Sequence, residues 1–330
     1  MKIRFFSRHP RSITESESMS GNKKNPTLAQ LIRAPFFSSI LAPIFAGTLL
    51  AVIISGHFSI YAFFLVTAMG LMLHTATNVY NDIYDTLQGT DKINRYRNEF
   101  SGGSGLIIQH PNILPKMFRI ARTSLIIALF CTLGLMCFVE KTLWPTLWGL
   151  YLLSAFFSKY YTSAPVKLAS RGWGEISVWF AFGPMAILVA AVSQNVGFHP
   201  TILLAMPLSG ISTLSILLVG QLIDLPADKE AGKWGVAARR GSRFTATLYT
   251  LVQAILILNV VVLAWHIGGN GWILLICLLP YLLFFPKTAK IIYKNHNNPA
   301  ALRRAAGINV QIHMVFSLQL VVSLTLVLLL

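Results

Sequence analysis

The sequence holds few charged residues, and acidic ones are the scarcest. Only 12% of its 330 residues are Asp, Glu, Lys or Arg, with 11 acidic side chains against 27 basic ones. Hydrophobic residues make up 55% of the chain and the mean hydropathy is +0.63. Several apolar runs approach the roughly 20 residues that a helix needs to cross a bilayer. This composition excludes a soluble protein and predicts an all-α membrane protein with many spans.

Cysteine is scarce as well. The three cysteines, Cys131, Cys137 and Cys277, all lie inside apolar runs and have no partner at a recurring spacing. Neither a disulfide framework nor a cysteine-bound zinc site is therefore indicated, and we interpret the three as packing residues.

Hydropathy predicts a polytopic bundle of about nine transmembrane helices, built as two four-helix halves plus a ninth helix. Residues 1–30 are basic, rich in serine and without an apolar period, which predicts a disordered cytoplasmic tail ahead of a single membrane domain over 31–330. The first apolar run lacks a cleavage pattern and is interpreted as a retained span. The expected spans are about 34–54, 58–80, 120–139, 143–161, 175–194, 199–220, 244–266, 271–289 and 308–329.

The distribution of basic residues supports this topology. With nine spans and a cytoplasmic N-terminus, 26 of the 27 Lys and Arg residues fall on the cytoplasmic side, and only Lys141 falls opposite. The C-terminus is then expected on the far side, and a bacterial inner membrane is the expected location. The net charge of +16 is explained as an orientation signal with attraction for anionic lipid or diphosphate. Dispersal of the basic residues over several loops argues against a nucleic-acid partner.

Acidic residues concentrate in two similar motifs, each at the end of a long apolar run. The first, NVYNDIYDTLQGTD from Asn78 to Asp91, carries Asp82 and Asp85, and its Asn78 and Asn81 are further polar candidates. If the helix continues through it, residues three and four apart share one face. The second motif, QLIDLPADKEAGK, begins at Gln221. Because the motifs follow the second and sixth spans, both are expected at the cytoplasmic face, where they would form one composite site.

The second motif spaces its carboxylates, Asp224 and Asp228, four residues apart. Four carboxylates in one cavity would repel one another unless cations were bound, and oxygen ligands suit Mg²⁺. The predicted metal-binding and catalytic residues are therefore Asp82, Asp85, Asp224 and Asp228. An acidic helix cap or a solvated loop remains the alternative for either motif alone.

Basic and aromatic residues near the motifs are candidates for substrate binding. Arg95, Arg97 and Lys233 could neutralise a polyphosphate, although each alone is more typical of a cytoplasmic loop residue without a ligand. SGGSG, at 101–105, could turn its amides toward an anion or form a flexible loop. Tyr161 and Lys167 follow the fourth span, where the tyrosine could stabilise a cation or belong to an interfacial belt.

Taken in series, these motifs resemble the UbiA superfamily of intramembrane aromatic prenyltransferases, and among them the 1,4-dihydroxy-2-naphthoate polyprenyltransferases. The residues that carry the resemblance are NDIYD with Gly89 and Asp91, SGGSG, YYTSAP, GWGE running into WFAFGP, and DLPADKEAGK followed by RRG. The chain departs from the family pattern at Gln221 and Trp234, and both departures bear on the acceptor and on activity.

The resemblance implies a nine-helix bundle with a cytoplasmic-side cavity and a lateral opening to lipid. It implies that Mg²⁺ held by the two Asp pairs binds the diphosphate of a polyprenyl donor. An aromatic acceptor, 1,4-dihydroxy-2-naphthoate in menaquinone synthesis, would then be prenylated with loss of its carboxylate. Asp91 and Glu175 are expected to orient the acceptor or a basic side chain. The expected partners are the two substrates and membrane lipid, with no obligate protein partner.

Other functions fit parts of the pattern. A member of the same superfamily with another aromatic or lipid acceptor would keep every motif. A cation-coupled transporter would also place acidic residues beside a cavity, usually nearer mid-membrane. A CDP-alcohol phosphotransferase would show an Asp-Gly and Ala-Arg spaced signature, which this sequence lacks. A catalytically inactive binding protein of the same superfamily is the fourth alternative.

Overall fold

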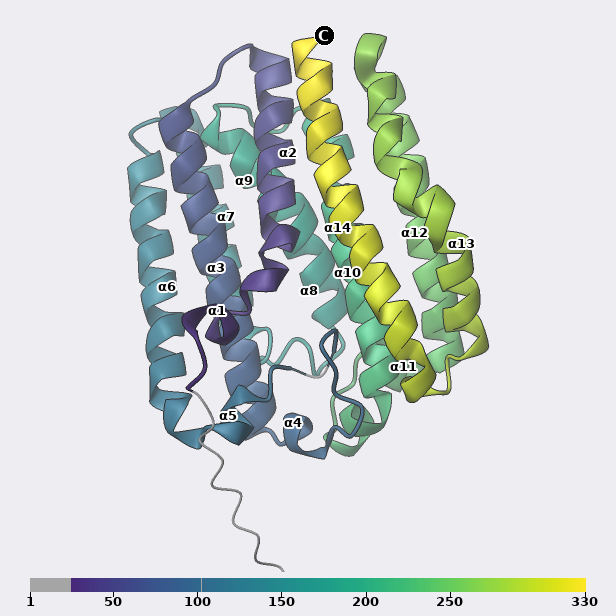
Figure 1. Cartoon of the computed structure of the whole chain (residues 1–330). Coiled ribbons are helices and arrows are strands. Elements are labelled where there is room, and N and C mark those ends of the chain that lie inside the picture. Colours follow the sequence, from purple (N-terminus) through teal and green to yellow (C-terminus); the bar gives the residue numbers. More distant parts are fainter. Residues whose placement is uncertain (1–24, 102) are drawn as a thin grey trace, which may run out of the picture.

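The computed structural model describes residues 25–101 and 103–330 (Figure 1). Most of the predicted N-terminal tail, up to residue 24, lies outside the described residues. The first described helix, α1 (Leu28–Leu31), begins inside the range predicted as tail and opens on a capping box formed by Thr27 and Gln30.

Long helices packed side by side make up most of the described chain, and most of the short helices lie at one end of them. The long elements are α2 (Ser38–Ser55), α3 (Ile60–Leu87), α6 (Leu114–Leu135), α7 (Trp144–Tyr160), α8 (Gly174–Phe180) continuing through the π-helical turn η4 (Ala181–Met185) into α9 (Ala186–Ser193), α10 (Pro200–Glu230), α12 (Ser242–Ile267), the 3₁₀ helix η5 (Gly269–Leu278) leading into α13 (Leu279–Lys294), and α14 (Pro299–Leu329). The short elements are α1, η1 (Ala34–Phe37), α4 (Thr90–Ile93), α5 (Leu106–Gln109), η2 (Pro111–Ile113), η3 (Lys141–Leu143) and α11 (Val236–Arg240).

The predicted bundle of about nine spans is confirmed. Among the described residues, eight helical segments are long and apolar enough to cross a membrane, and α7, with 17 residues, supplies the ninth rod. Only helices satisfy every backbone hydrogen bond internally, which is why apolar runs of this length predict the architecture well. The protein is therefore an integral membrane protein.

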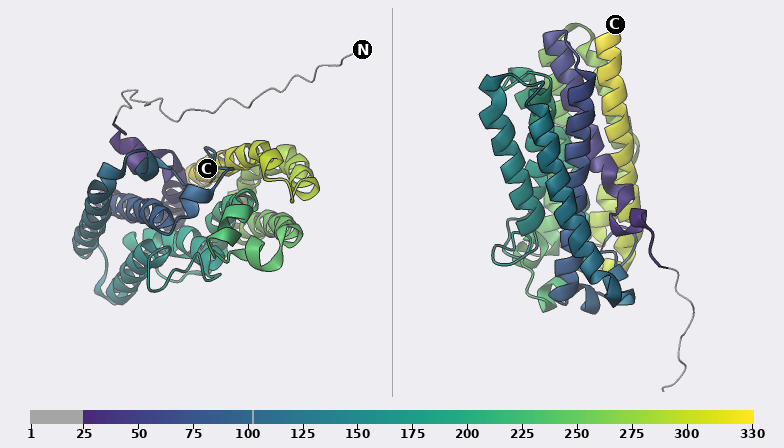
Figure 2. Two further views of the ribbon diagram at one scale, coloured as in Figure 1. Left: turned by 90° about the horizontal axis from the view of Figure 1, so that it is seen from below. Right: turned by 90° about the vertical axis from the view of Figure 1, so that its left-hand side faces the viewer.

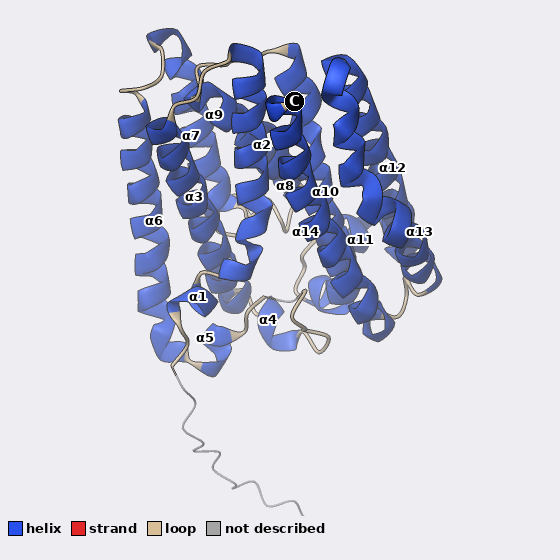
Figure 3. Ribbon diagram, turned by 45° about the horizontal axis from the view of Figure 1, so that its top comes forward, coloured by secondary structure: helices blue, strands red, loops and turns tan. Residues whose placement is uncertain are grey.

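Helices α3, α10 and α14 extend furthest beyond the predicted spans, at the end where most of the short helices gather. Helix α3 runs on to Leu87 and α10 to Glu230, so both acidic motifs begin on helices. Helix α14 begins at Pro299, nine residues before the predicted start. Figure 3 shows the short helices α1, α4 and α5 and several loops at this same end, whereas the C-terminus lies toward the other. Both motifs are thus delivered to one face of the bundle.

Helices from the N-terminal and C-terminal halves of the chain lie on different sides of the bundle. Seen from below in Figure 2, α3, α6 and α7 group on one side and α12, α13 and α14 on the other. Helix α10 lies between them and packs on α8, α12 and α14. The grouping agrees with the predicted division into two halves.

Glycines allow α10 to approach the α8–η4–α9 rod very closely. A Cβ atom on Gly210 would lie 2.2 Å from the carbonyl oxygen of Trp179 and 3.0 Å from the Cα of Gly183. The clashing atoms are backbone, so no side-chain movement would relieve them. Small residues at helix crossings are typical of membrane bundles, because tight packing replaces the hydrophobic driving force that lipid removes.

We therefore expect Gly210→Ala to destabilise the protein by about 1–3 kcal/mol, because overpacking forces two helices apart. Thermal unfolding in detergent would measure the loss. Gly149→Ala in α7 is the matched control, since a Cβ there meets nothing within 4 Å, and its melting temperature should stay unchanged. Equal melting temperatures for the two variants would contradict the close-packing account.

Buried polar contacts fix α14 in the bundle. His313 Nε2 is hydrogen-bonded to Ser39 Oγ of α2 at 3.1 Å, and His313 Nδ1 to Ser212 Oγ of α10 at 2.9 Å. One turn away, Asn309 contacts Ser215 and Tyr249. Such interhelical hydrogen bonds fix the relative rotation of neighbouring helices in an apolar surrounding.

Candidate active site

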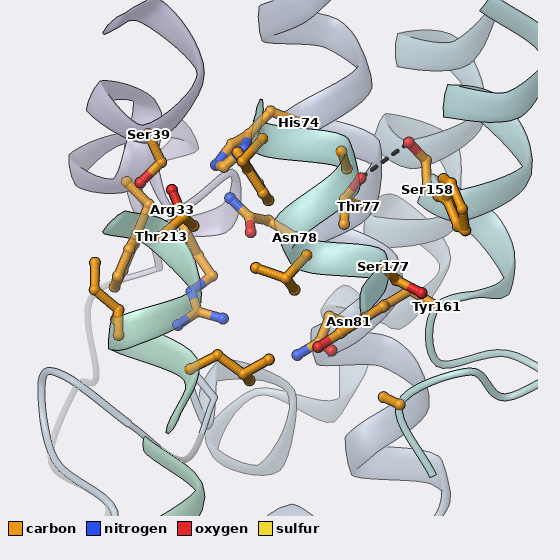
Figure 4. A pocket seen from close by; sticks show the side chains of 18 of the residues that line it. Arg33, Ser39, His74, Thr77, Asn78, Asn81, Ser158, Tyr161, Ser177 and Thr213 are labelled. Atoms are coloured by element: carbon orange, nitrogen blue, oxygen red, sulfur yellow. Dashed lines mark hydrogen bonds between the residues drawn. The ribbon is translucent and has the colours of Figure 1, made fainter. Parts of the chain in front are cut away.

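A cavity of about 300 Å³ opens inside the bundle between α3, α10 and the α8–η4–α9 rod. Its volume is at the lower end of the range for small-molecule sites. Its upper part is mainly apolar and includes Leu73, Phe182 and Met185. The lower part is polar, and Figure 4 shows Arg33, Asn78, Asn81 and Tyr161 among its lining side chains.

The two acidic motifs meet in this cavity although they are far apart in the sequence. Asp85 and Asp91 line it from the first motif, and Asp224 and Asp228 from the second. Helix α3 carries Asp85, and the turn at Gly89 (φ 87°) returns the chain so that Asp91 faces the same space. Helix α10 carries the other two on one face, as their spacing predicts.

Lys233 lies among these carboxylates. Its Nζ donates to both carboxylate oxygens of Asp85, at 3.2 and 3.3 Å. Burial lowers the pKa of Lys233, but Asp85 and Asp228 more than offset this, so the pKa is raised above its ordinary value. The ammonium group is thus the cation that this arrangement of carboxylates holds in the structure.

Loop residues between α4 and α5 cap the cavity from below. Asn94 Nδ2 and Ser101 Oγ both donate to Asp224 Oδ1 at 2.8 Å. A Cβ on Gly103 (φ 69°) would lie 2.8 Å from either carboxylate oxygen of Asp91. Glycine is required there because the loop backbone packs directly on that carboxylate. Asn94 is a site residue that sequence reasoning missed, since nothing in its local pattern pairs it with a helix 130 residues away.

Asp91 lies just beyond the end of α3, with an acidic and a basic side chain near it. Burial raises the pKa of its carboxyl to about 7, and the neighbouring Asp85 adds to the rise while Arg97 opposes it. Arg97 contacts the Asp91 backbone carbonyl and lies 3.9 Å from its carboxylate. Arg97, which was predicted to bind substrate, therefore contacts Asp91 of the same loop.

Asp82 has a different position from the other predicted metal ligands. It is 1% exposed and does not line the cavity. Its Oδ1 lies 3.5 Å from Arg33 Nη1 and accepts the backbone N–H of Ser104 at 3.2 Å. One amide of the SGGSG segment, that of Ser104, therefore binds this chain's own Asp82, while Asp82 Oδ2 has no hydrogen-bond partner among the described residues. Arg33, which lies 49 residues earlier, was missed by sequence reasoning.

The remaining predicted residues divide between the cavity and the surface. Asn81 donates to Asp85 Oδ2 at 3.1 Å and accepts from Thr162, whereas the Asn78 amide faces the cavity one turn above. Tyr161 also lines the cavity, and burial raises the pKa of its phenol. Arg95 and Lys167 do not line the cavity.

Glu175 and Gln221 explain one departure from the expected motif. Gln221 Nε2 donates to Glu175 Oε1 at 2.7 Å, while its Oε1 accepts from the backbone of Ala237 at 3.3 Å. Gln221 thereby joins α8 and α11 to the motif helix. Trp234, the second departure, is 49% exposed, and its backbone N–H bonds to Ser170.

The donor set fits a hard cation, although its atoms are not gathered around one point. Carboxylate and amide oxygens from Asp85, Asp224, Asp228 and Asn78 face one space, and such ligands suit Mg²⁺. Within the described residues no three His, Cys, Asp or Glu side chains are close enough to hold one ion. Lys233 occupies the position between the two motifs.

Comparison with known proteins gives matches over most of the chain. It is 25% identical over 287 residues to a 2-carboxy-1,4-naphthoquinone phytyltransferase of Synechocystis, covering 86% of this chain and 87% of that one. It is 25% identical over 252 residues to a 1,4-dihydroxy-2-naphthoate octaprenyltransferase of Bacillus subtilis, covering 76% and 78%.

Solved structures share the fold at low identity. A UbiA homolog from Archaeoglobus fulgidus, solved bound to DMAPP and Mg²⁺, superposes with a TM-score of 0.60 at 13% identity, over 89% of this chain and 98% of that one. A homolog from Aeropyrum pernix gives a TM-score of 0.62 at 12% identity, over 86% and 97%. The model of the UbiA prenyltransferase family matches residues 40–314. With the acidic motifs meeting in a membrane cavity, this match shows that the chain belongs to the UbiA prenyltransferase family.

Proposed function

We propose that this protein catalyses the Mg²⁺-dependent transfer of a polyprenyl group from a polyprenyl diphosphate to an aromatic acceptor, 1,4-dihydroxy-2-naphthoate, in menaquinone biosynthesis. The names of the bacterial relatives support the acceptor. The Archaeoglobus homolog bound to DMAPP and Mg²⁺ supports the donor class and the metal. The observation that carries the proposal is the meeting of both acidic motifs around Lys233 in one membrane cavity.

In the proposed reaction the lower, polar end of the cavity binds the diphosphate. Asp85, Asp224 and Asp228 would hold Mg²⁺, which supplies charge stabilisation for the departing diphosphate. Asn94 and Ser101 fix the orientation of Asp224, and Asn81 fixes that of Asp85. Preorganised charge is the main means by which such a site lowers a barrier, because the ligands need not reorganise as the bond breaks.

The apolar upper part of the cavity suits the tail of the donor and the ring of the acceptor. Leu73, Phe157, Phe182 and Met185 give it walls without charge, which hold the polyprenyl tail and keep water from the allylic cation. The acceptor carbon attacks that cation, and the ring then loses carbon dioxide. The products are a prenylated dihydroxynaphthalene, diphosphate and carbon dioxide.

The loop charges and the family support a placement in the membrane. We propose that the protein lies in a bacterial inner membrane, with the N-terminus in the cytoplasm and the C-terminus on the other side. The end of the bundle that carries both motifs also carries most of the basic loops, which is typical of a cytoplasmic face. Residues 31–330 would form one membrane domain, since both halves line the same cavity.

A direct assay tests the proposed function. Membranes containing the protein, a radiolabelled polyprenyl diphosphate, Mg²⁺ and 1,4-dihydroxy-2-naphthoate should yield a labelled, decarboxylated product identifiable by mass spectrometry. Equimolar release of carbon dioxide and diphosphate is expected. Transfer to 4-hydroxybenzoate but not to the naphthoate would refute the acceptor and keep the reaction class.

Removing divalent cations should abolish this transfer. We expect EDTA to reduce the rate to background and added Mg²⁺ to restore it, because among the described residues the cavity sets only Lys233 and Arg33 against four carboxylates and leaves the charge of the diphosphate uncompensated. The titration is followed by product formation, and EDTA already saturated with Mg²⁺ is the control. Full activity in metal-free buffer would contradict the proposed role of the acidic motifs.

A further inference from the structure

His74 has an unusual position in the cavity. It lies on α3 and is 6% exposed, yet neither ring nitrogen has a hydrogen-bond partner. Other buried side chains in the described residues also leave a polar atom unpaired, but among them His74 alone lines the cavity. Leaving a buried polar group unpaired is costly, so such a group at a ligand site points to a partner that the ligand supplies.

The ring of His74 is held in one orientation by apolar contacts. Phe37 packs against it edge-on at 5.7 Å between ring centroids, and Phe182 does so at 5.2 Å. His313 provides the contrast within the same bundle, because both of its nitrogens contact serine hydroxyls. His74 is therefore positioned by packing alone, and its polar atoms are left to the cavity that Figure 4 shows beside it.

His74 lies far along α3 from the end of the cavity that would bind the diphosphate. Asp85 lies eleven residues after His74, a separation of about 16 Å along a helix axis. That is too far for a phosphate oxygen bound at Asp85. A prenyl tail has no polar atom to offer, so the ligand that meets His74 must be the other substrate.

The charges of Arg33 and His74 indicate which group of the acceptor each of them would bind. Arg33 lines the same cavity and carries a guanidinium, the better partner for a carboxylate. A neutral imidazole offers one donor and one acceptor, which suits a hydroxyl group. We propose that His74 hydrogen-bonds a ring hydroxyl of the aromatic acceptor and thereby selects hydroxylated rings over bare ones. This inference rests on the proposed function and adds the recognition of the acceptor to it.

Binding of two acceptor probes to purified protein, without donor, tests the proposal. 1,4-Dihydroxy-2-naphthoate and 2-naphthoate share the ring and the carboxylate but differ in both hydroxyls. We expect the wild type to bind the dihydroxy compound more tightly and His74→Leu to lose roughly three- to tenfold of that preference, the value of one hydrogen bond. His74→Gln keeps a hydrogen-bonding group and should retain part of it.

His313→Leu is the matched control. It removes a buried histidine whose partners are protein serines, so it should lower the melting temperature and leave the acceptor preference unchanged. His74→Leu should instead keep or raise the melting temperature of the ligand-free protein, since it removes an unpaired polar group. In transfer assays the KM for the acceptor should rise in His74→Leu while the KM for the donor stays constant.

Two results would overturn the proposal: an unchanged preference in His74→Leu, including an equal loss of affinity for both probes, or a rise in the donor KM alone. Acceptor binding is measured without donor. A wild-type protein that bound the acceptor but transferred no prenyl group would therefore refute the proposed function, while the role of His74 in acceptor binding could still be tested.

Discussion

Asp85→Asn and Asp224→Asn should each lower kcat by at least about a hundredfold. Both substitutions keep the shape of the side chain and remove its charge. For Asp224, the amide carbonyl can still accept from Asn94 and Ser101, so the fold of the loop is preserved. What is lost is a charged oxygen for a hard cation, and with it the stabilisation of the leaving diphosphate.

The measurement is a rate of product formation against Mg²⁺ concentration, with protein folding checked by thermal unfolding. Glu99→Gln is the control, since Glu99 is exposed and pairs with Arg303 at 3.0 Å outside the cavity. Its rate should stay within about twofold of the wild type, because exposed pairs contribute little. Comparable losses in Glu99→Gln and Asp224→Asn would show that charge at the surface, and not at the cavity, governs the rate.

Asp82→Asn separates the two interpretations of the first motif. If Asp82 holds the loop through Arg33 and Ser104, the variant should lose thermal stability while its half-saturating Mg²⁺ concentration stays near that of the wild type. If Asp82 binds metal, that concentration should rise as far as it does for Asp85→Asn.

The sequence was a good guide to the helices because the bilayer leaves few choices. Apolar runs near 20 residues must be helical, and the loop charges give the direction. The start of α14 was predicted nine residues late because Arg303 and Arg304 interrupt the apolar run. A helix extending out of the membrane tolerates these charges on its exposed face, and Arg303 uses that position to reach Glu99.

The candidate site was predictable where spacing along a helix decides which side chains lie together. Asp224 and Asp228 share a face because they are four residues apart. Contacts made by loops were not predictable in the same way. By sequence alone Arg33 and Arg95 are equally plausible as site residues. The path of the chain nevertheless places Arg33 in the cavity and leaves Arg95 outside it. His74 gave no signal at all, since a histidine in an apolar run is most often a packed one.

Lys233→Met should have the second large effect and should move two quantities in opposite directions. Lys233 bonds both oxygens of Asp85 and is also stabilised by Asp228. In the metal-free protein it therefore occupies the place of a cation. Without it, the buried carboxylates lack compensation, and a divalent cation gains affinity because it no longer competes with the ammonium group. We expect tighter binding of Mn²⁺, used as a spectroscopic substitute, in the absence of donor.

Catalysis by Lys233→Met should nevertheless fall roughly 10- to 100-fold, the value of a charged hydrogen bond. When metal takes the carboxylates, Lys233 is released toward the outer oxygens of the diphosphate, and methionine offers them nothing. Lys233→Arg is the matched variant, since it keeps the charge: Mn²⁺ affinity should stay near that of the wild type and part of the rate should return. A Lys233→Met protein that bound Mn²⁺ more weakly would show instead that the lysine assembles the metal site, and the competition argued from its contacts with Asp85 would be wrong.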